Sequence, residues 1–171
     1  MTNWPRTARA FTRWVVAIAA LLIGAPCCAS VPLTPYAKLT ASDGASDDRF
    51  GASVAIDGGL AIVGAYGDDD GGSDAGAAYL FDVATGQQTA KLLAADAAAF
   101  DEFGRGVALE GGVALAGAPY DADNGFGSGS ADAIDIATGR PGGKLVADDA
   151  AVGDLFAAQV AIDGGVAIVG A

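Results

Sequence analysis

The chain repeats itself every 53 residues, and this period constrains its fold more than any other feature. Three residue types recur in step: Phe50, Phe103 and Phe156; Lys38, Lys91 and Lys144; Ala65, Ala118 and Ala171. A period of this length indicates a modular array in which each unit buries surface against its neighbours. We therefore divide the chain into a lead-in, 30–37, two full units, 38–90 and 91–143, and a partial third unit, 144–171.

Residues 1–29 have the order of a secretory signal peptide. Arg6, Arg9 and Arg13 precede an apolar run of eleven residues, 15–25, and small residues lead to Ala29. The run is shorter than the roughly 20 residues that cross a bilayer, which disfavours an uncleaved anchor. A lipoprotein site is also disfavoured, because a proline and a second cysteine stand among the residues before the last cysteine. We expect both cysteines to leave with the signal, and we expect a secreted or cell-surface protein without disulfides.

The composition excludes several function classes. The net charge is −12, and three of the nine basic residues lie in the signal segment. A chain this acidic repels nucleic acid and anionic lipid, so we expect neither as a partner, and no membrane insertion once the signal is cleaved. Solvation of a secreted surface also accounts for such a charge. The chain has no histidine, and so no imidazole for general base catalysis or metal binding.

Each unit predicts four short strands and no helix. Two apolar runs flank Asp57-Gly58-Gly59, a strong hairpin signal because glycine supplies the positive φ of a tight turn. In the first unit we expect strands at 52–56, 60–63, 77–83 and 88–93, with an acidic, glycine-rich loop at 66–76. The second strand is apolar on both faces, since Ala61 and Val63 point one way and Leu60 and Ile62 the other.

A strand that is apolar on both faces is covered on both sides. Four-stranded sheets that stack radially and cover one another are the blades of a β-propeller. A linear β-solenoid is the alternative, but its hexa- and nonapeptide repeats are far shorter than 53 residues. The predicted fold is therefore all-β, with about two and a half blades of four antiparallel strands in an incomplete propeller.

The units resemble FG-GAP repeats, the blades of integrin α-subunit propellers and of many secreted bacterial proteins. The motifs that carry the resemblance are Phe50-Gly51, Phe103-Gly104 and Gly117-Ala118-Pro119, whereas Gly64-Ala65-Tyr66 and Phe156-Ala157 depart from the pattern. The resemblance implies a propeller, typically of seven blades, that serves adhesion or ligand binding. Integrin-type units also hold calcium between their first two strands. The Asp57-Gly58-Gly59 turn is too short for an ion with about six to eight oxygen ligands.

Acidic residues gather instead in the loop that follows the second strand. We select them as candidate metal ligands because hard cations bind several carboxylates on a flexible loop. The candidates are Asp68, Asp70 and Asp74 in the first unit and Asp121 and Asp123 in the second. Two interpretations stay open, a calcium site and a solvated acidic loop. The other acidic stretch, 43–48, recurs in register at 96–101 and 149–154, with Arg49 and Arg105 nearby. It is interpreted as a structural connection between blades.

The aromatic residues divide into two groups. Phe50, Phe103 and Phe156 keep one register and are expected to be core anchors. Tyr66, Tyr120 and Phe126 lie in loops, where aromatic side chains either contact partners or pack locally.

Three functions are compared. The first is a secreted or cell-surface module for adhesion or ligand binding, with an extracellular protein or glycan as its partner. The second is a purely structural array within a larger surface protein. The third is a hydrolase that uses Glu102 and Glu110, but both residues occupy ordinary repeat positions, and no nucleophile elbow or phosphate loop is present. We therefore expect no enzyme activity.

The phase of the repeat suggests a part of a longer protein. Residues 36–40 match the fourth strand of a unit, and the third unit stops after its second strand. Propellers need about four to eight blades to close. We expect the chain to be a fragment whose remaining blades lie elsewhere.

Overall fold

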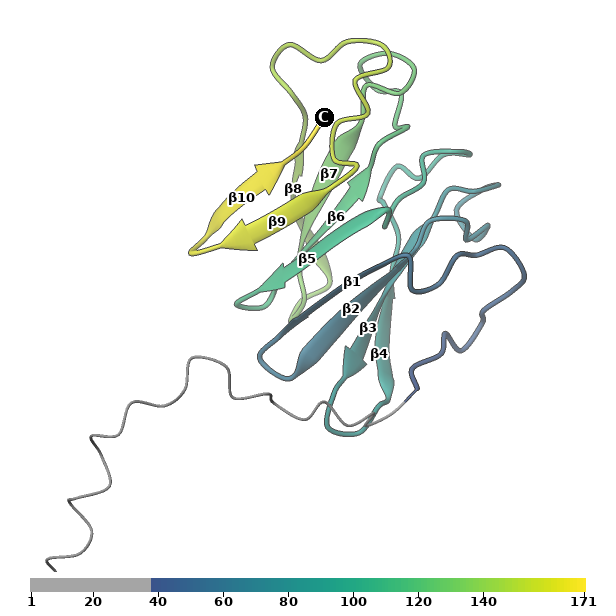
Figure 1. Ribbon diagram of the computed structural model, residues 1–171, viewed down its shortest axis with the longest axis vertical. Coiled ribbons are helices and arrows are strands. Elements are labelled where there is room, and N and C mark those ends of the chain that lie inside the picture. The colour runs from purple at the N-terminus through teal and green to yellow at the C-terminus, as the bar shows by residue number, and fades with distance from the viewer. Residues whose placement is uncertain (1–37) are drawn as a thin grey trace, which may run out of the picture. The chain divides into compact units, whose positions relative to one another are not determined.

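The computed structural model describes residues 38–171, and these form strands and turns. Three antiparallel sheets follow one another along the chain (Figure 1). The first has the order β1-β2-β3-β4, with bounds Ser53–Asp57, Leu60–Ala65, Ala77–Asp82 and Gln88–Leu92. Within this described part there is no helix long and apolar enough to cross a membrane.

The second sheet repeats the first, and the third repeats its first two strands. The order β5-β6-β7-β8 comprises Gly106–Glu110, Val113–Ala118, Ser130–Asp135 and Arg140–Leu145. The last sheet pairs β9, Val160–Asp163, with β10, Val166–Val169. The predictions of an all-β chain and of four-stranded antiparallel blades are confirmed. The signal peptide and the lead-in lie outside the described residues.

Tight glycine turns produce the hairpins. Gly58 and Gly59 have φ values of 55° and 87°, and Gly111 and Gly112 have 56° and 85°. Two successive residues with positive φ match the right-handed twist of the flanking strands, which is why the Asp-Gly-Gly sequence joins β1 to β2 so closely.

The core lies between neighbouring sheets. Ile62 and Leu80 of the first sheet pack with Val107 of β5 in one buried cluster. On the other side of the second sheet, Leu115 packs with Ile162 of β9. Each blade therefore covers its neighbour with side chains from alternate strand positions, as expected from strands that are apolar on both faces.

The outer face of the first blade is aromatic. Tyr79 and Phe81 are buried there, and the ring of Phe50 meets them edge-on, at centroid distances of 5.6 and 6.0 Å. Phe103 is fully buried between the first two blades. The phenylalanines of the repeat are thus packing residues.

Residues 38–40 differ from expectation. We predicted a fourth strand at 36–40, but the described residues 38–40 form no strand. A strand needs a neighbour to pair with, and no strand within residues 38–171 pairs with this segment. Leu39 packs instead against the outer face of the first blade.

Candidate functional site

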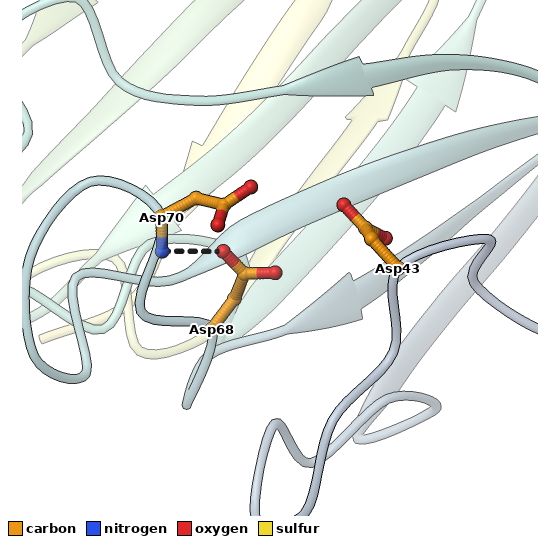
Figure 2. Close-up of side chains that lie close together, drawn as sticks. All are labelled: Asp43, Asp68 and Asp70. Carbon is orange, nitrogen blue, oxygen red and sulfur yellow. Dashed lines mark hydrogen bonds between the residues drawn. The ribbon is translucent and has the colours of Figure 1, made fainter.

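A lysine ammonium holds three carboxylates together beside the first blade. Nζ of Lys91, on β4, lies 2.8 Å from Asp43, 2.7 Å from Asp68 and 2.6 Å from Asp70, measured to Oδ2 in each case. Asp68 and Asp70 come from the loop after β2, and Asp43 enters from the segment before β1 (Figure 2). These four residues are called the first cluster.

Asp68 is the buried centre of this cluster. Its side chain is 4% exposed. The hydroxyl of Tyr79 donates to its Oδ2 at 2.7 Å. The N–H of Asp70 donates to its Oδ1 at 3.0 Å, as Figure 2 shows. Lys91 Nζ also lies 5.2 Å from the centroid of the Tyr79 ring. Both oxygens of the buried carboxylate are therefore hydrogen-bonded, as a buried charge requires.

The charges of the first cluster support one another. Burial of Lys91 opposes its positive charge, but hydrogen bonds to Asp43, Asp68 and Asp70 outweigh burial and raise its pKa. The hydrogen bond from Lys91 lowers the pKa of the Asp43 carboxyl. Burial and the bond to Asp68 raise the pKa of Tyr79, so its hydroxyl remains a donor.

An equivalent second cluster lies beside the second blade. Nζ of Lys144, on β8, lies 2.6 Å from Asp96, 2.5 Å from Asp121 and 2.8 Å from Asp123. The N–H of Asp123 donates to Oδ1 of Asp121 at 2.8 Å. Burial disfavours the charged form of Asp121, but the hydrogen bond from Lys144 outweighs it and lowers the pKa. Lys144 and these three aspartates are called the second cluster.

The two clusters differ in the residues that the third strand of each blade, β3 or β7, places next to them. The position of Tyr79 is taken by Asp132, and that of Ala77 by Ser130. Ser130 donates its hydroxyl to Oδ2 of Asp121 at 2.7 Å. Asp132 is 8% exposed, and its buried Oδ2 accepts no hydrogen bond from residues 38–171. Burial raises the pKa of this carboxyl to about 6.

The first cluster does not fit a calcium ion in its present arrangement. In each cluster the carboxylate oxygens lie within 4.8 Å of one another, close enough to share a cation. In the first cluster Lys91 already bonds all three carboxylates, and both oxygens of buried Asp68 have donors. A metal would therefore have to displace the ammonium without satisfying any group that lacks a partner.

The structure brings together four of the five residues selected from the sequence. Asp68 joins Asp70 in the first cluster, and Asp121 joins Asp123 in the second. Asp74 is not part of the first cluster; its N–H donates to the Asp69 carboxylate, and its carbonyl accepts the N–H of Glu102.

Sequence reasoning missed half of each cluster. Asp43 and Asp96 were interpreted as parts of the connections between blades, and Lys91 and Lys144 only as markers of the period. A signal existed, because the lysines and their acidic partners all recur at the same 53-residue spacing.

Arginine and tyrosine side chains gather where the first two blades meet. The Arg105 guanidinium carbon lies 4.9 Å from the ring centroid of Tyr66 and 5.9 Å from that of Tyr120, within the range of cation–π attraction. Arg105 also pairs with Glu102. Its side chain keeps 39% of its surface exposed, and both tyrosines are half-buried. We call Tyr66, Arg105 and Tyr120 the tyrosine–arginine cluster.

The two glutamates do not form a catalytic pair in this arrangement. Glu102 pairs with Arg105. The Glu110 carboxylate accepts the N–H groups of Gly164 and Gly165 at 2.7 and 3.0 Å. Each glutamate is therefore engaged by its own partners in a different place.

Comparison with known proteins decides the family. The family profile described as the FG-GAP repeat matches residues 34–81 and 87–131, which is more than half of the chain. The chain belongs to the FG-GAP repeat family. No curated protein matches it. Among solved structures, the crystal structure of the computationally designed Ika4 protein is similar at 13% identity and a TM-score of 0.33, covering 80% of this chain and 93% of that one.

The structure explains why the FG-GAP motif needs its glycines. A Cβ on Gly64 would lie 1.9 Å from the carbonyl oxygen of Gly104, and one on Gly117 would lie 2.0 Å from that of Ala157. The Gly-Ala of one FG-GAP repeat thus touches the Phe-Gly position of the next, backbone against backbone. Ala157 replaces glycine in the third repeat and keeps a positive φ of 70°. The glycines of the motif therefore allow the backbones of neighbouring blades to pack closely.

Proposed function

We propose that this chain is an extracellular, non-catalytic binding module whose ligand contacts the tyrosine–arginine cluster. Tyr66 follows β2 and Tyr120 follows β6, so the loops of two blades bring their aromatic rings to within 4.9 and 5.9 Å of the Arg105 guanidinium carbon. Tyrosine and arginine dominate the binding energy of many interfaces, and loops held by a rigid sheet scaffold are common binding sites. This grouping is the observation that carries the proposal.

The cluster is also specific to one junction. The equivalents of Arg105 in the other repeats are Ala52 and Ala158, so the stacking of blades does not require an arginine here. A residue that departs from the repeat and remains partly exposed favours a role other than packing. The partner we propose is an extracellular protein or a glycan, because the acidic surface disfavours nucleic acid and anionic lipid.

A binding screen tests this function. The purified protein is applied to glycan arrays and to a panel of extracellular matrix proteins, and each hit is repeated with Tyr66→Ala and Tyr120→Ala. We expect at least tenfold weaker binding of both variants. Phe126→Ala is the matched control, because Phe126 is a loop aromatic that is 71% exposed but lies outside the tyrosine–arginine cluster. A ligand that binds both tyrosine variants as well as the wild type would refute the proposed site.

A structural array is the second candidate, and the same cluster supports it. Arg105 contacts rings from two different blades, so these contacts also join the blades. If the cluster serves only to fasten blades, Tyr66→Ala lowers the melting temperature and the screen yields no ligand. The two measurements together separate fastening from recognition.

We also propose that residues 1–29 direct export and are then removed. Their basic start and short apolar run support this. Expression in a secreting host, followed by mass spectrometry of the mature N-terminus, tests it. A mature chain that begins at Ser30 is expected, and retention of the whole chain in the cell would contradict the proposal.

For the acidic loops of both repeats the sequence leaves two interpretations open, a calcium site and a solvated acidic loop. For the first repeat we propose instead that Lys91 serves as the cation, joining the segment before β1, the loop after β2 and strand β4. The acidic loop residues there are then part of the scaffold of the binding module.

A further inference from the structure

Both junctions between neighbouring sheets within residues 38–171 use the same apolar contact. In each, two aliphatic residues on the first strand of one sheet pack against a residue on the second strand of the sheet before it. The pairs are Val107 with Leu109 on β5 and Val160 with Ile162 on β9. They pack with Ile62 of β2 and with Leu115 of β6, respectively. Accordingly, β5 lies beside β1, and β9 lies beside β5 (Figure 1).

The first and the last sheet each expose one half of this contact. Val54 and Ile56 hold the positions of the aliphatic pair on β1, and they are 67% and 68% exposed. Ile168 of β10 holds the position of Ile62 and Leu115, and it is 71% exposed. Large apolar side chains that are exposed together on one face mark an interaction surface. The chain therefore exposes both halves of a contact that it forms twice internally.

The polar part of the junction is open in the same way. Glu110 accepts the N–H groups of both glycines in the hairpin turn of the third repeat. Gly58 and Gly59 form the equivalent turn of the first repeat, also with positive φ, and their N–H groups donate to no carboxylate within residues 38–171. Asp163 holds the position of Glu110 and is exposed. One sheet thus offers the donors and another the carboxylate.

We propose that copies of this chain associate head to tail, with Val54 and Ile56 of one copy packed on Ile168 of the next. Asp163 of that second copy then accepts the N–H groups of the glycine turn between β1 and β2. Continuity with the internal junctions supports this occupant, because a second copy supplies both the apolar and the hydrogen-bonded half of the contact that each surface makes inside the chain. The inference is independent of the ligand proposed for the tyrosine–arginine cluster.

The proposed contact joins two different surfaces of the same protein. Each copy that has used one surface therefore keeps the other available, so association continues beyond two copies unless the rotation closes a ring. This distinguishes the contact from a symmetric dimer, in which a surface meets its own equivalent.

Sedimentation velocity of the purified protein, from about 2 to about 500 µM, tests the association. We expect the mean mass of the wild type to rise with concentration, and the chains to be separate at the lowest concentration. Ile56→Glu and Ile168→Glu should each stay single chains, because a charge would be buried in an apolar contact. Val152→Glu is the matched control, since Val152 is 71% exposed before β9 and lies outside both surfaces, and it should associate as the wild type does. Asp163→Ala should weaken association at least threefold.

A mixture of the two glutamate variants makes the test decisive. Ile56→Glu keeps the surface at Ile168, and Ile168→Glu keeps the surface at Val54, so the equimolar mixture should form a one-to-one complex and nothing larger. Association of either variant alone would mean that like surfaces meet and would overturn the head-to-tail arrangement, as would a mixture that stays separate. A wild type that remains a single chain at every concentration would overturn the proposal, whether residues 30–37 or another protein covers Val54. Circular dichroism confirms that each variant is folded.

Discussion

The carboxylate of Asp57, in the hairpin turn of the first blade, accepts the backbone N–H of Gly111, in the turn of the second blade, at 2.9 Å. Glu110 makes the same contact one repeat later, with the N–H groups of Gly164 and Gly165. In the first two blades, the acidic residue that begins the turn thus binds the glycine turn of the following blade. In the sequence these acidic residues read as ordinary turn residues, but in the structure their side chains link neighbouring blades.

Removing one of these links should destabilise the array. Glu110→Ala deletes two hydrogen bonds to a charged acceptor at an exposed position, and we expect a loss of about 1 kcal/mol in unfolding free energy. Urea denaturation followed by circular dichroism measures it. Asp163→Ala is the control, since this exposed residue holds the same position in the third repeat but makes no such bond in the described chain. Equal losses in the two variants would contradict the link.

The hydroxyl of Tyr79 should contribute to the stability of the fold in addition to the packing of its ring. Tyr79→Phe keeps the packing but removes the donor to buried Asp68, and we expect a loss of about 2 kcal/mol because the acceptor is charged. Tyr120→Phe, at a half-buried ring with no hydroxyl bond in the described residues, is the comparison and should change stability by less than about 0.5 kcal/mol. Chemical denaturation of both variants gives the difference. A loss in Tyr120→Phe as large as that in Tyr79→Phe would argue against this role of the hydroxyl.

Loss of the ammonium in the first cluster should be among the most costly single changes. Lys91→Met leaves Asp68 buried without its cation, for which a loss of about 3 kcal/mol is expected. Lys38 occupies the same repeat position and is exposed, so Lys38→Met should have little effect. Thermal unfolding of the two variants side by side checks this. Comparable stability of the two would show that the cluster tolerates an unpaired charge.

One valine pair tests the packing between blades directly. Val107 is 7% exposed between the first two blades, and Val54, one repeat earlier, is 67% exposed. Val107→Ala should cost about 2 kcal/mol and Val54→Ala less than about 0.5 kcal/mol. The substitution is chemically identical, so a difference in unfolding free energy reports burial alone. Similar values would mean that the interface is not formed in solution.

The Asp101 carboxyl should contribute a pH dependence of known sign. Burial raises its pKa, while the N–H of Ala98 donates to it at 2.8 Å and Asp121 acts on it as a like charge. A raised folded pKa means that the stabilisation is present below the unfolded pKa of about 3.9 and is lost as pH rises through the folded value. Relative to Asp101→Asn, the wild type should lose stability as pH rises from about 4. Denaturation at several pH values measures this, and an opposite slope would reject the assignment.

The repeat predicts most of the fold because the physics of a blade is local. Alternating apolar residues, glycine turns and a fixed period determine the strands, and β2, at Leu60–Ala65, begins at the predicted residue. The prediction of a strand at 38–40 is wrong because a strand also needs a neighbouring strand to pair with, and a local sequence pattern does not show whether one is present.

The clusters were only half predicted for a related reason. Asp68 and Asp70 are close in sequence and were found, whereas Asp43 and Lys91 reach them only because the sheet and the connection before it fold around the same point. Aligning the repeats would also have shown that the lysines and their acidic partners recur together at the same spacing. The exchange of Tyr79 for Asp132 is visible in the sequence, but its significance depends on burial, which only the structure provides.

Each blade has two unlike faces, since Val107 and Leu109 cover one neighbour and Leu115 covers the other. The array therefore has a direction, and a blade cannot be turned over without losing both contacts. Duplication or deletion of a whole 53-residue unit carries one copy of each face and leaves every remaining junction matched. An insertion or deletion of only part of a unit disrupts the contacts between blades on both sides of it. Proteins built from this repeat should therefore differ in length by whole repeats.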